Sequence, residues 1–220
     1  EEDFINRGEI ISEDVDVKVD CVLINNGEIS VDGIGERING GKVYLEAGEI
    51  IHQGIISANA YEGGNAGEIV IISQRQTKLE SGSTTEAKAL GLIGNGGRIF
   101  IDSRAGNTFV DKNAIIDVSA GGLKGNAGFI EISAYKQLGF YGILSGRAPP
   151  GYQIATAIFD PQTASISGEI SSHLSVYALD DITIVGDVFI DEGVILTLLA
   201  DHKDTKEWDN TSPGIGAVIN

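Results

Sequence analysis

The stretch Gly125–Pro161, GNAGFIEISAYKQLGFYGILSGRAPPGYQIATAIFDP, contains the unit that the rest of the 220-residue chain repeats. A cluster of small residues precedes a short run with apolar residues at alternate positions, a second apolar run follows, and a loop leads to the next strand. Alternation with a period of two is typical of a strand with one buried face. The stretch therefore predicts one rung of a β-solenoid, and we expect the chain to be a stack of such rungs.

Glycine-led strands recur along the chain. Four segments place a Gly before apolar residues at alternate positions, beginning at Gly41, Gly67, Gly97 and Gly128, which are 26, 30 and 31 residues apart. Three of them follow a cluster of Gly, Asn and Ala, and Gly and Asn tolerate the positive φ values that tight corners require. This spacing lies in the range of solenoid rungs.

A second recurring frame is Ile-x-x-Gly-x-Ile, which begins at Ile5, Ile24 and Ile51. It gives each rung at least two strands, and we expect His52, within the third copy, to point outward from its strand. A single rung exposes apolar edges that only a neighbouring rung can cover. The sequence therefore predicts an all-β fold, a parallel β-helix, with a right-handed course expected from the general rule for parallel crossovers.

The pattern changes once along the chain. Glycine-cornered rungs of about 19–31 residues occupy residues 1–161, whereas shorter alternating strands occupy residues 162–220, with a polar loop at 201–212. We interpret the whole as a single β-helix segment, and we expect it to be a fragment of a larger protein. Residues 83–92, STTEAKALGL, are interpreted as a strand end with an excursion, the alternative being a helical turn or two.

Charge and cysteine content exclude several classes of function. The net charge is −17, from 15 basic and 32 acidic residues, which argues against binding nucleic acid and anionic membranes. No apolar run approaches the roughly 20 residues needed to cross a bilayer, so the chain is not expected to be transmembrane. The single cysteine, Cys21, allows no intramolecular disulfide, and the alternating run 15–23 around it predicts a buried thiol.

One combination of segments resembles a known family. The run Gly125–Ala134, GNAGFIEISA, the Pro-containing loop Ala148–Gly151 and the ending Phe159–Pro161 are similar to segments of the filamentous-haemagglutinin-like exoproteins of two-partner secretion. Members of this family often show Gly-Gly-Phe-Val-Glu-x-Ser followed by Leu-Asp-Pro before the next strand. The resemblance covers most of the chain.

The resemblance implies a role and a location. It implies export through an outer-membrane partner barrel, and a β-helical protein that is secreted or held at the outer cell surface. Adhesion, aggregation or surface coating would be its role. Its partners would be a surface or host glycan or protein, or neighbouring copies of itself.

No group of residues in the sequence converges on a catalytic site, so we expect a non-enzymatic protein with no catalytic or cofactor-binding residues. Two alternatives stay open, a carbohydrate-binding or polysaccharide-cleaving β-helix and a self-assembling extracellular fibre subunit. A hydrolase would need two carboxylates at a defined separation. The candidate acids, bases and histidines are Asp102, Asp111, Asp117, Asp180 and Asp181; Arg75, Lys78, Arg98, Arg104 and Lys112; and His52, His173 and His202, the last three too far apart in sequence for a local metal motif.

The one candidate metal site is a cluster of acidic residues in the polar loop. Carboxylate oxygens in a flexible loop are suitable ligands for Ca²⁺, and a solvated loop is the alternative interpretation. The predicted ligands are Asp201, Asp204, Glu207 and Asp209.

Overall fold

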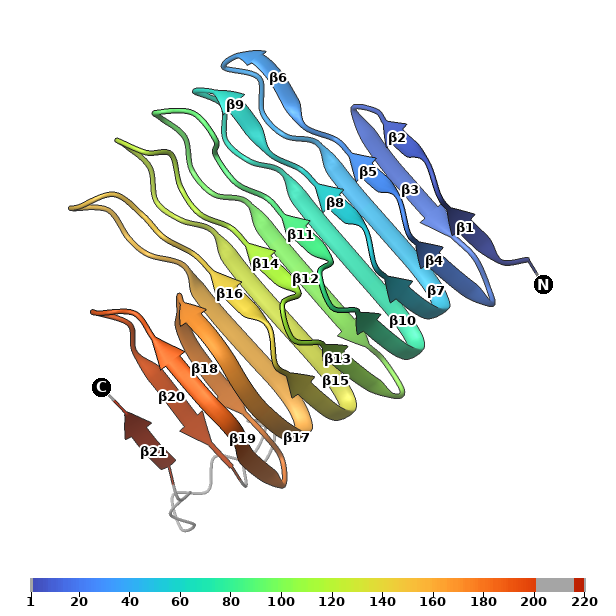
Figure 1. Cartoon of the computed structure of the whole chain (residues 1–220), viewed down its shortest axis with the longest axis vertical. Coiled ribbons are helices and arrows are strands. Elements are labelled where there is room, and N and C mark those ends of the chain that lie inside the picture. Colours follow the sequence, from blue (N-terminus) through green and yellow to red (C-terminus); the bar gives the residue numbers. More distant parts are fainter. Residues whose placement is uncertain (1, 201–215, 220) are drawn as a thin grey trace, which may run out of the picture.

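The computed structural model describes residues 2–200 and the backbone of residues 216–219. Strands connected by turns and loops make up this part of the chain, and it contains no helix. Every strand pair is parallel except β20 with β21 (Gly216–Ile219), which is antiparallel. The prediction of a parallel β-helix is therefore confirmed, and Figure 1 shows its rungs side by side from the N-terminus to the C-terminus.

Apart from β6 and β9, the strands form one continuous 19-stranded sheet that wraps around the core, and we call its three sides faces A, B and C. A long strand that bends at a corner contributes to two faces, or, in the case of β17, to all three. Face A contains β3 (Asp14–Lys18), the first parts of β7 (Lys42–His52) and β10 (Glu68–Leu79), β12 (Arg98–Ser103), the first parts of β15 (Phe129–Phe140) and β17 (Thr156–Ser171), β18 (His173–Tyr177) and β20 (Leu196–Leu199).

The other two faces follow face A in each rung. Face B contains β1 (Phe4–Asn6), β4 (Val22–Asn25), the second parts of β7, β10 and β15, β13 (Asn107–Val110), the middle of β17 and the start of β19 (Asp181–Ile190). Face C contains β2 (Glu9–Ile11), β5 (Glu28–Ser30), β8 (Ile55–Ser57), β11 (Thr84–Glu86), β14 (Ile115–Asp117), β16 (Ile143–Ser145) and the ends of β17 and β19. The short strands β6 (Gly33–Glu36) and β9 (Ala60–Glu62) pair in the loops beyond face C.

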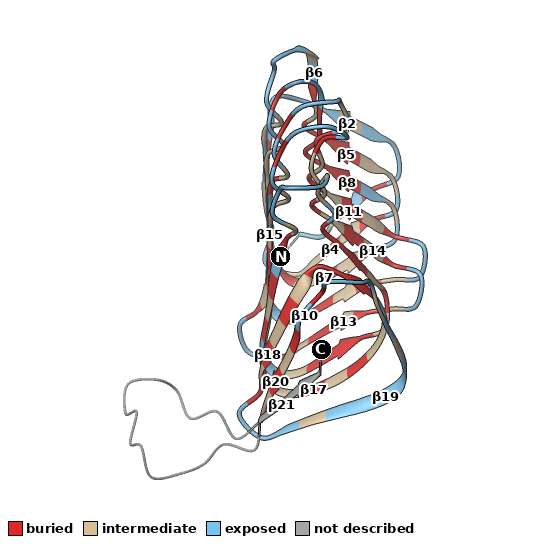
Figure 2. Ribbon diagram, turned by 90° about the vertical axis from the view of Figure 1, so that its left-hand side faces the viewer, coloured by how far each residue is buried: buried red, intermediate tan, exposed pale blue. Residues whose placement is uncertain are grey.

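The core consists of columns of apolar side chains that run along the stack. One column on face A contains Val43, Ile69, Ile99 and Ile130, which are aligned by the strand register and fully buried. Apolar burial stabilises by roughly 25 cal/mol per Å², so each added rung contributes to the same continuous core. Figure 2 shows buried and intermediate residues along most strands, and exposed residues in many of the outer loops and along β19.

The glycines at the start of the face A strands are required by close contact between rungs. A Cβ on Gly67, Gly97 or Gly128 would lie 1.9, 2.0 or 1.9 Å from the carbonyl oxygen of the preceding glycine in the stack. No positive φ is found at these three residues, whereas Gly94 and Gly125, within the preceding corner clusters, have φ of 144°. Positive φ therefore explains the corner glycines, and close approach of the backbone explains the strand-leading ones.

The strands after Pro161 are not all short, contrary to expectation. Strand β17 has 16 residues and runs through Pro161, which lies at the corner between faces A and B where the register to β15 shifts. A missing N–H is tolerated at such an irregularity. The length of the rung falls from 27 residues (Phe129 to Thr156) to 17 (Thr156 to His173), since the loop beyond face C is absent.

Two predictions about single side chains were wrong. His52, which was expected to point outward, is fully buried, and its ring nitrogens contact Asn25 and the backbone carbonyl of Thr84. Cys21 is only half-buried, because β3 ends at Lys18 and β4 begins at Val22, so that Cys21 lies in a corner and not in one continuous strand. Residues 83–92 contain β11 and no helix, as expected.

Candidate functional site

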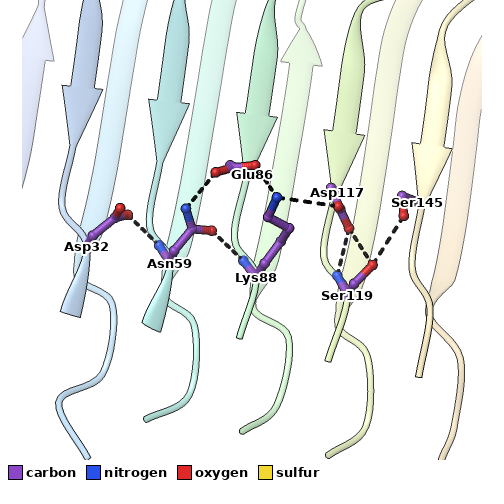
Figure 3. A network of polar contacts seen from close by, with 7 residues as sticks. All are labelled: Asp32, Asn59, Glu86, Lys88, Asp117, Ser119 and Ser145. Carbon is purple, nitrogen blue, oxygen red and sulfur yellow. Dashed lines mark hydrogen bonds and ion pairs between the residues drawn. The ribbon is translucent and has the colours of Figure 1, made fainter. Parts of the chain in front are cut away.

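A row of polar side chains crosses successive rungs where face C leads into the outer loops. We call it the polar ladder, and it contains Asp32, Asn59, Glu86, Lys88, Asp117, Ser119 and Ser145 (Figure 3). Parallel pairing of β5, β8, β11, β14 and β16 places one or two of these residues on each of five rungs.

Asn59 occupies the centre of the first half of the ladder and is 1% exposed. Its backbone N–H donates to Asp32 Oδ1 at 2.7 Å, and its side-chain Nδ2 donates to Glu86 Oε1 at 2.7 Å. Its Oδ1 accepts the backbone N–H of Lys88 at 2.8 Å. The amide is thus bonded to two groups of the next rung, which ties the two rungs together at a buried position.

Lys88 lies between two carboxylates. Its Nζ is 2.6 Å from Glu86 Oε2 and 3.8 Å from Asp117 Oδ2. Burial lowers the pKa of Lys88, but the hydrogen bond and charge of Glu86, with the charge of Asp117, outweigh this effect and raise the pKa above its ordinary value. The ammonium therefore stays charged at neutral pH, which makes Lys88 an ion-pair partner and a poor base or nucleophile.

The second half of the ladder is made of hydroxyl groups. Ser119 Oγ donates to Asp117 Oδ1 at 2.5 Å, lies 3.2 Å from Ser145 Oγ, and accepts the backbone N–H of Arg147 at 3.1 Å. A hydroxyl bound to a carboxylate without an imidazole lacks the base–orienter arrangement of hydrolases. The Ser119–Ser145 contact and the bond from the Arg147 N–H run from one rung to the next, whereas Ser119 and Asp117 belong to the same rung.

An asparagine ladder at the corner before face A repeats this arrangement. The side-chain oxygens of Asn39, Asn65, Asn95 and Asn126 accept the backbone N–H of the residue at the same position in the next rung, at 2.8–3.0 Å, ending at Gln153. Asparagine is one of the residues of the Gly/Asn clusters that mark these corners in the sequence. None of these four asparagines has a positive φ, so their role in the structure is to bond successive rungs.

A third ladder contains the buried His52. Asn6 Nδ2 donates to Asn25 Oδ1 at 2.8 Å, and Asn25 Nδ2 lies 3.2 Å from His52 Nδ1. His52 Nε2 lies 3.1 Å from the carbonyl oxygen of Thr84. Since an amide N–H must donate to Nδ1 and a carbonyl must accept from Nε2, the ring is the neutral tautomer with the proton on Nε2. Burial lowers the pKa of His52 to about 4.

Two carboxyl groups on the outside of face A have perturbed pKa values. Burial raises the pKa of Asp102, against the charge of Arg104, and burial with the charges of Asp160 and Asp102 raises the pKa of Glu131. Asp102 was a candidate acid from sequence, whereas Glu131 was not. In the sequence Glu131 is one residue of an alternating strand, and the strand register that places it near Asp102 could not be predicted.

The remaining sequence candidates are distributed over different surfaces. Asp111 follows β13 and pairs with Lys78 at 3.3 Å, whereas Asp117 belongs to the polar ladder. Arg104 pairs with Glu46 at 3.3 Å at the corner between faces A and B. The structure therefore does not gather these acids and bases into one site. Arg98 lies over the ring of Phe129, and Arg75 and Lys112 lie at separate corners. Asp180 accepts a hydrogen bond from the side chain of Gln162, and Asp181 is the first residue of β19. His173 accepts a hydrogen bond from the backbone N–H of Ile195.

Two surface hollows are present in the described chain. The larger, of about 620 Å³, lies at the corner between faces A and B near the N-terminus and is lined by Lys18, Asp20 and Glu46 among others. The smaller, of about 310 Å³, is lined by Asn113, Tyr141 and Phe189 among others. Neither contains any of the carboxyl groups with raised pKa values.

The predicted calcium ligands Asp201, Asp204, Glu207 and Asp209 lie outside the described residues. Within the residues that are described, no group of three or more His, Cys, Asp or Glu side chains is placed to hold a metal ion. The calcium site stays a prediction. Isothermal titration of the whole chain with Ca²⁺ tests it: binding that is lost in the Asp204→Asn/Asp209→Asn variant is expected, and no heat at millimolar Ca²⁺ would contradict it.

Two further findings bear on classification. No helix in the described part of the chain has the length and apolar character to span a bilayer. Comparison of the chain with models of protein families, with curated proteins and with solved structures gave no match.

Proposed function

We propose that the chain is a non-enzymatic structural or adhesive segment of a large secreted cell-surface protein. The proposal rests on one observation, the contacts that the polar side chains make. In all three ladders they bond one rung to the next, and Lys88 is held as an ion-pair partner. Polar groups committed to stacking support a scaffold whose role is to present its outer surface.

The resemblance of Gly125–Pro161 to two-partner exoproteins supports the same proposal. It favours export through an outer-membrane barrel and a location outside the cell. Adhesion, aggregation or surface coating would then be the function, with a host glycan, a host protein or further copies of the chain as the partner. The excess of acidic residues keeps an elongated surface soluble outside the cell.

An adhesion assay tests this proposal. Beads coated with the purified chain should bind host cells or a glycan array, and beads coated with the Ile101→Asp variant, which buries a charge in the core, should not. The same protein should release no sugar from pectate, alginate or chitin-type polymers. Depolymerisation by the folded chain would overturn the proposal.

The competing proposal is a polysaccharide-cleaving β-helix, and one observation favours it. Asp102 and Glu131 lie on adjacent strands with raised pKa values, as a general acid would require. If this alternative is correct, the variants Asp102→Asn and Glu131→Gln should each abolish depolymerisation while leaving the fold intact. The matched control is Asp16→Asn, an exposed acid on the outside of the same face.

A further inference from the structure

The outer loops beyond face C concentrate exposed apolar side chains. Five such loops, residues 33–39, 60–65, 89–95, 120–126 and 147–153, protrude side by side from one side of the stack (Figure 1). We define the tip ridge as six of the eight large apolar side chains that these loops expose, leaving out Ile38 of the first loop and Tyr152 of the last. They are Ile34, Tyr61, Leu90, Leu92, Ile93 and Leu123.

The tip ridge is continuous across rungs. Gly33 pairs with Ala60 and Ala60 with Ala89, which brings the residues that follow them, Ile34, Tyr61 and Leu90, to neighbouring places on three successive rungs, with a register shift between β6 and β9 after Gly33. Leu123 N–H donates to the carbonyl oxygen of Leu92 at 2.8 Å, which stacks these two leucines on the next pair of rungs. A contiguous exposed apolar patch of this kind is typical of an interaction surface.

The charges of the tip loops differ from those of the rest of the chain. The five loops hold two acidic and three basic residues, so that the other 30 of the 32 acidic residues and 12 of the 15 basic residues lie elsewhere. Contact between two copies through most other surfaces would therefore bring excess negative charge together. Contact through the tip loops would not.

The order of these charges along the row is self-complementary. The first two loops contain Glu36, Arg37 and Glu62, and the last two contain Lys124 and Arg147. Arg147 is paired with Asp191 of the same chain at 3.0 Å, so Lys124 is the residue that makes this end of the ridge basic. If two copies meet with their rungs in opposite directions, the net acidic end of each ridge lies against the basic end of the other. An interface with twofold symmetry requires this kind of self-complementarity.

We propose that the tip ridge is the site at which two copies of this chain associate laterally, with antiparallel rung order. The ridge loop 89–95 lies at the centre of the interface, and loop 60–65 of one copy faces loop 120–126 of the other. Both ridges have the same strand spacing of about 4.8 Å, so their side chains interdigitate over several rungs. The pairing holds or fails independently of the adhesive role proposed above.

Sedimentation equilibrium of the full chain from 1 to 500 µM tests the association. The weight-average mass should rise with concentration from 23.1 kDa toward twice that value. The Leu92→Asp/Leu123→Asp variant should remain a monomer at every concentration. The control is Tyr135→Asp, because Tyr135 is as exposed as Leu92, at 66%, but lies at the corner between faces A and B.

Charge reversal tests the antiparallel order. The Glu62→Lys and Lys124→Glu variants should each weaken the dimer about fivefold, because two ion pairs are lost per dimer and rim pairs contribute little each. The double variant should restore the association, since both copies then carry the reversed pair. Circular dichroism of each variant verifies that the fold is retained.

Cysteine cross-linking provides a measurement that does not depend on affinity. In a Cys21→Ser background, Leu92→Cys should form a disulfide-linked dimer by itself, and Tyr61→Cys should do so only when mixed with Leu123→Cys. A chain that stays monomeric at 500 µM, or a Leu92→Asp/Leu123→Asp variant that associates like Tyr135→Asp, overturns the proposal. Self-linking of Tyr61→Cys overturns the antiparallel order.

Discussion

His52 is a titratable group placed where charge is not tolerated. Its two ring nitrogens are engaged by Asn25 and by the carbonyl of Thr84, and the next residue in the same column is the apolar Leu79. A second ring proton would have to replace the hydrogen bond that Asn25 donates to Nδ1. The buried imidazole is therefore held neutral by its hydrogen bonds as well as by burial.

This arrangement makes stability depend on pH between about 6.5 and about 4. Above pH 6.5 the ring is neutral in both states. Below pH 6.5 the imidazole is protonated in the unfolded chain but not in the folded chain, where the pKa of His52 is about 4. The free energy of unfolding therefore decreases as the pH is lowered from 6.5, and it levels off below pH 4. The loss attributable to His52 is about 3 kcal/mol.

The measurement is urea unfolding at pH 7 and pH 4. The wild-type chain should lose about 3 kcal/mol more between these pH values than the His52→Asn variant, in which a non-titrating amide continues the asparagines of the preceding rungs. Protonation of the carboxyl groups lowers the stability of both proteins by the same amount, so it cancels when the two losses are compared. Equal losses in the two proteins would show that His52 does not titrate in this range.

The glycines of the Ile-x-x-Gly-x-Ile frame provide a matched pair. A Cβ on Gly27 would lie 2.1 Å from the carbonyl oxygen of Gly8, whereas a Cβ on Gly8 would meet nothing within 4 Å, and neither residue has a positive φ. We expect Gly27→Ala to destabilise by about 3 kcal/mol or more through backbone displacement, and Gly8→Ala to change stability by less than about 1 kcal/mol. Thermal unfolding of both variants checks this, and equal melting temperatures would contradict it.

Among the elements, the loops beyond face C depend on the polar ladder at their base. Asn59 is buried, and both atoms of its amide bond to the next rung. Its replacement by Ala leaves the backbone N–H of Lys88 without its acceptor. The ladder therefore fixes how each outer loop leaves its rung.

We expect Asn59→Ala to cost about 2–3 kcal/mol of unfolding free energy. The control is Lys42→Ala, since Lys42 pairs with Glu68 at 2.7 Å but both side chains are more than a third exposed, and its loss should cost less than about 0.5 kcal/mol. Chemical denaturation of the two variants distinguishes them. An Asn59→Ala variant as stable as Lys42→Ala would show that the ladder is not a structural link.

The elements differ in how well the sequence predicts them. Apolar alternation after a glycine is a local pattern, and it located the strands that begin near Gly67, Gly97 and Gly128. The polar ladder was not predicted, because Asn59, Lys88 and Ser119 are about 30 residues apart and meet only through the exact rung length. The path of β17 through Pro161 was not predicted, because a proline inside a strand normally removes a hydrogen bond of the ladder. Pro161 lies at a corner where the register between β15 and β17 shifts, so its missing N–H removes no such bond.

At the scale of the whole molecule, the fold is a stack in which each rung contacts only its neighbours. Strand β12 is paired on both sides, by β10 and β15, whereas in the described chain β1 pairs only with β4 and β2 only with β5. The free energy of unfolding of such a stack is the sum of a contribution from each rung and a contribution from each contact between neighbouring rungs. Opening should therefore begin at the ends and reach the centre last.

Hydrogen exchange measured by mass spectrometry tests this one-dimensional behaviour. Amides of β10, β12 and β15 should exchange most slowly, and those of β1 and β2 fastest. The Ile101→Ala variant removes a fully buried side chain from β12 at a cost of about 2–5 kcal/mol. Because coupling passes between neighbours, exchange should accelerate most in β10, β12 and β15 and least in β1. An equal acceleration in every strand would mean that the chain unfolds as one cooperative unit and that the rungs have no separate stability.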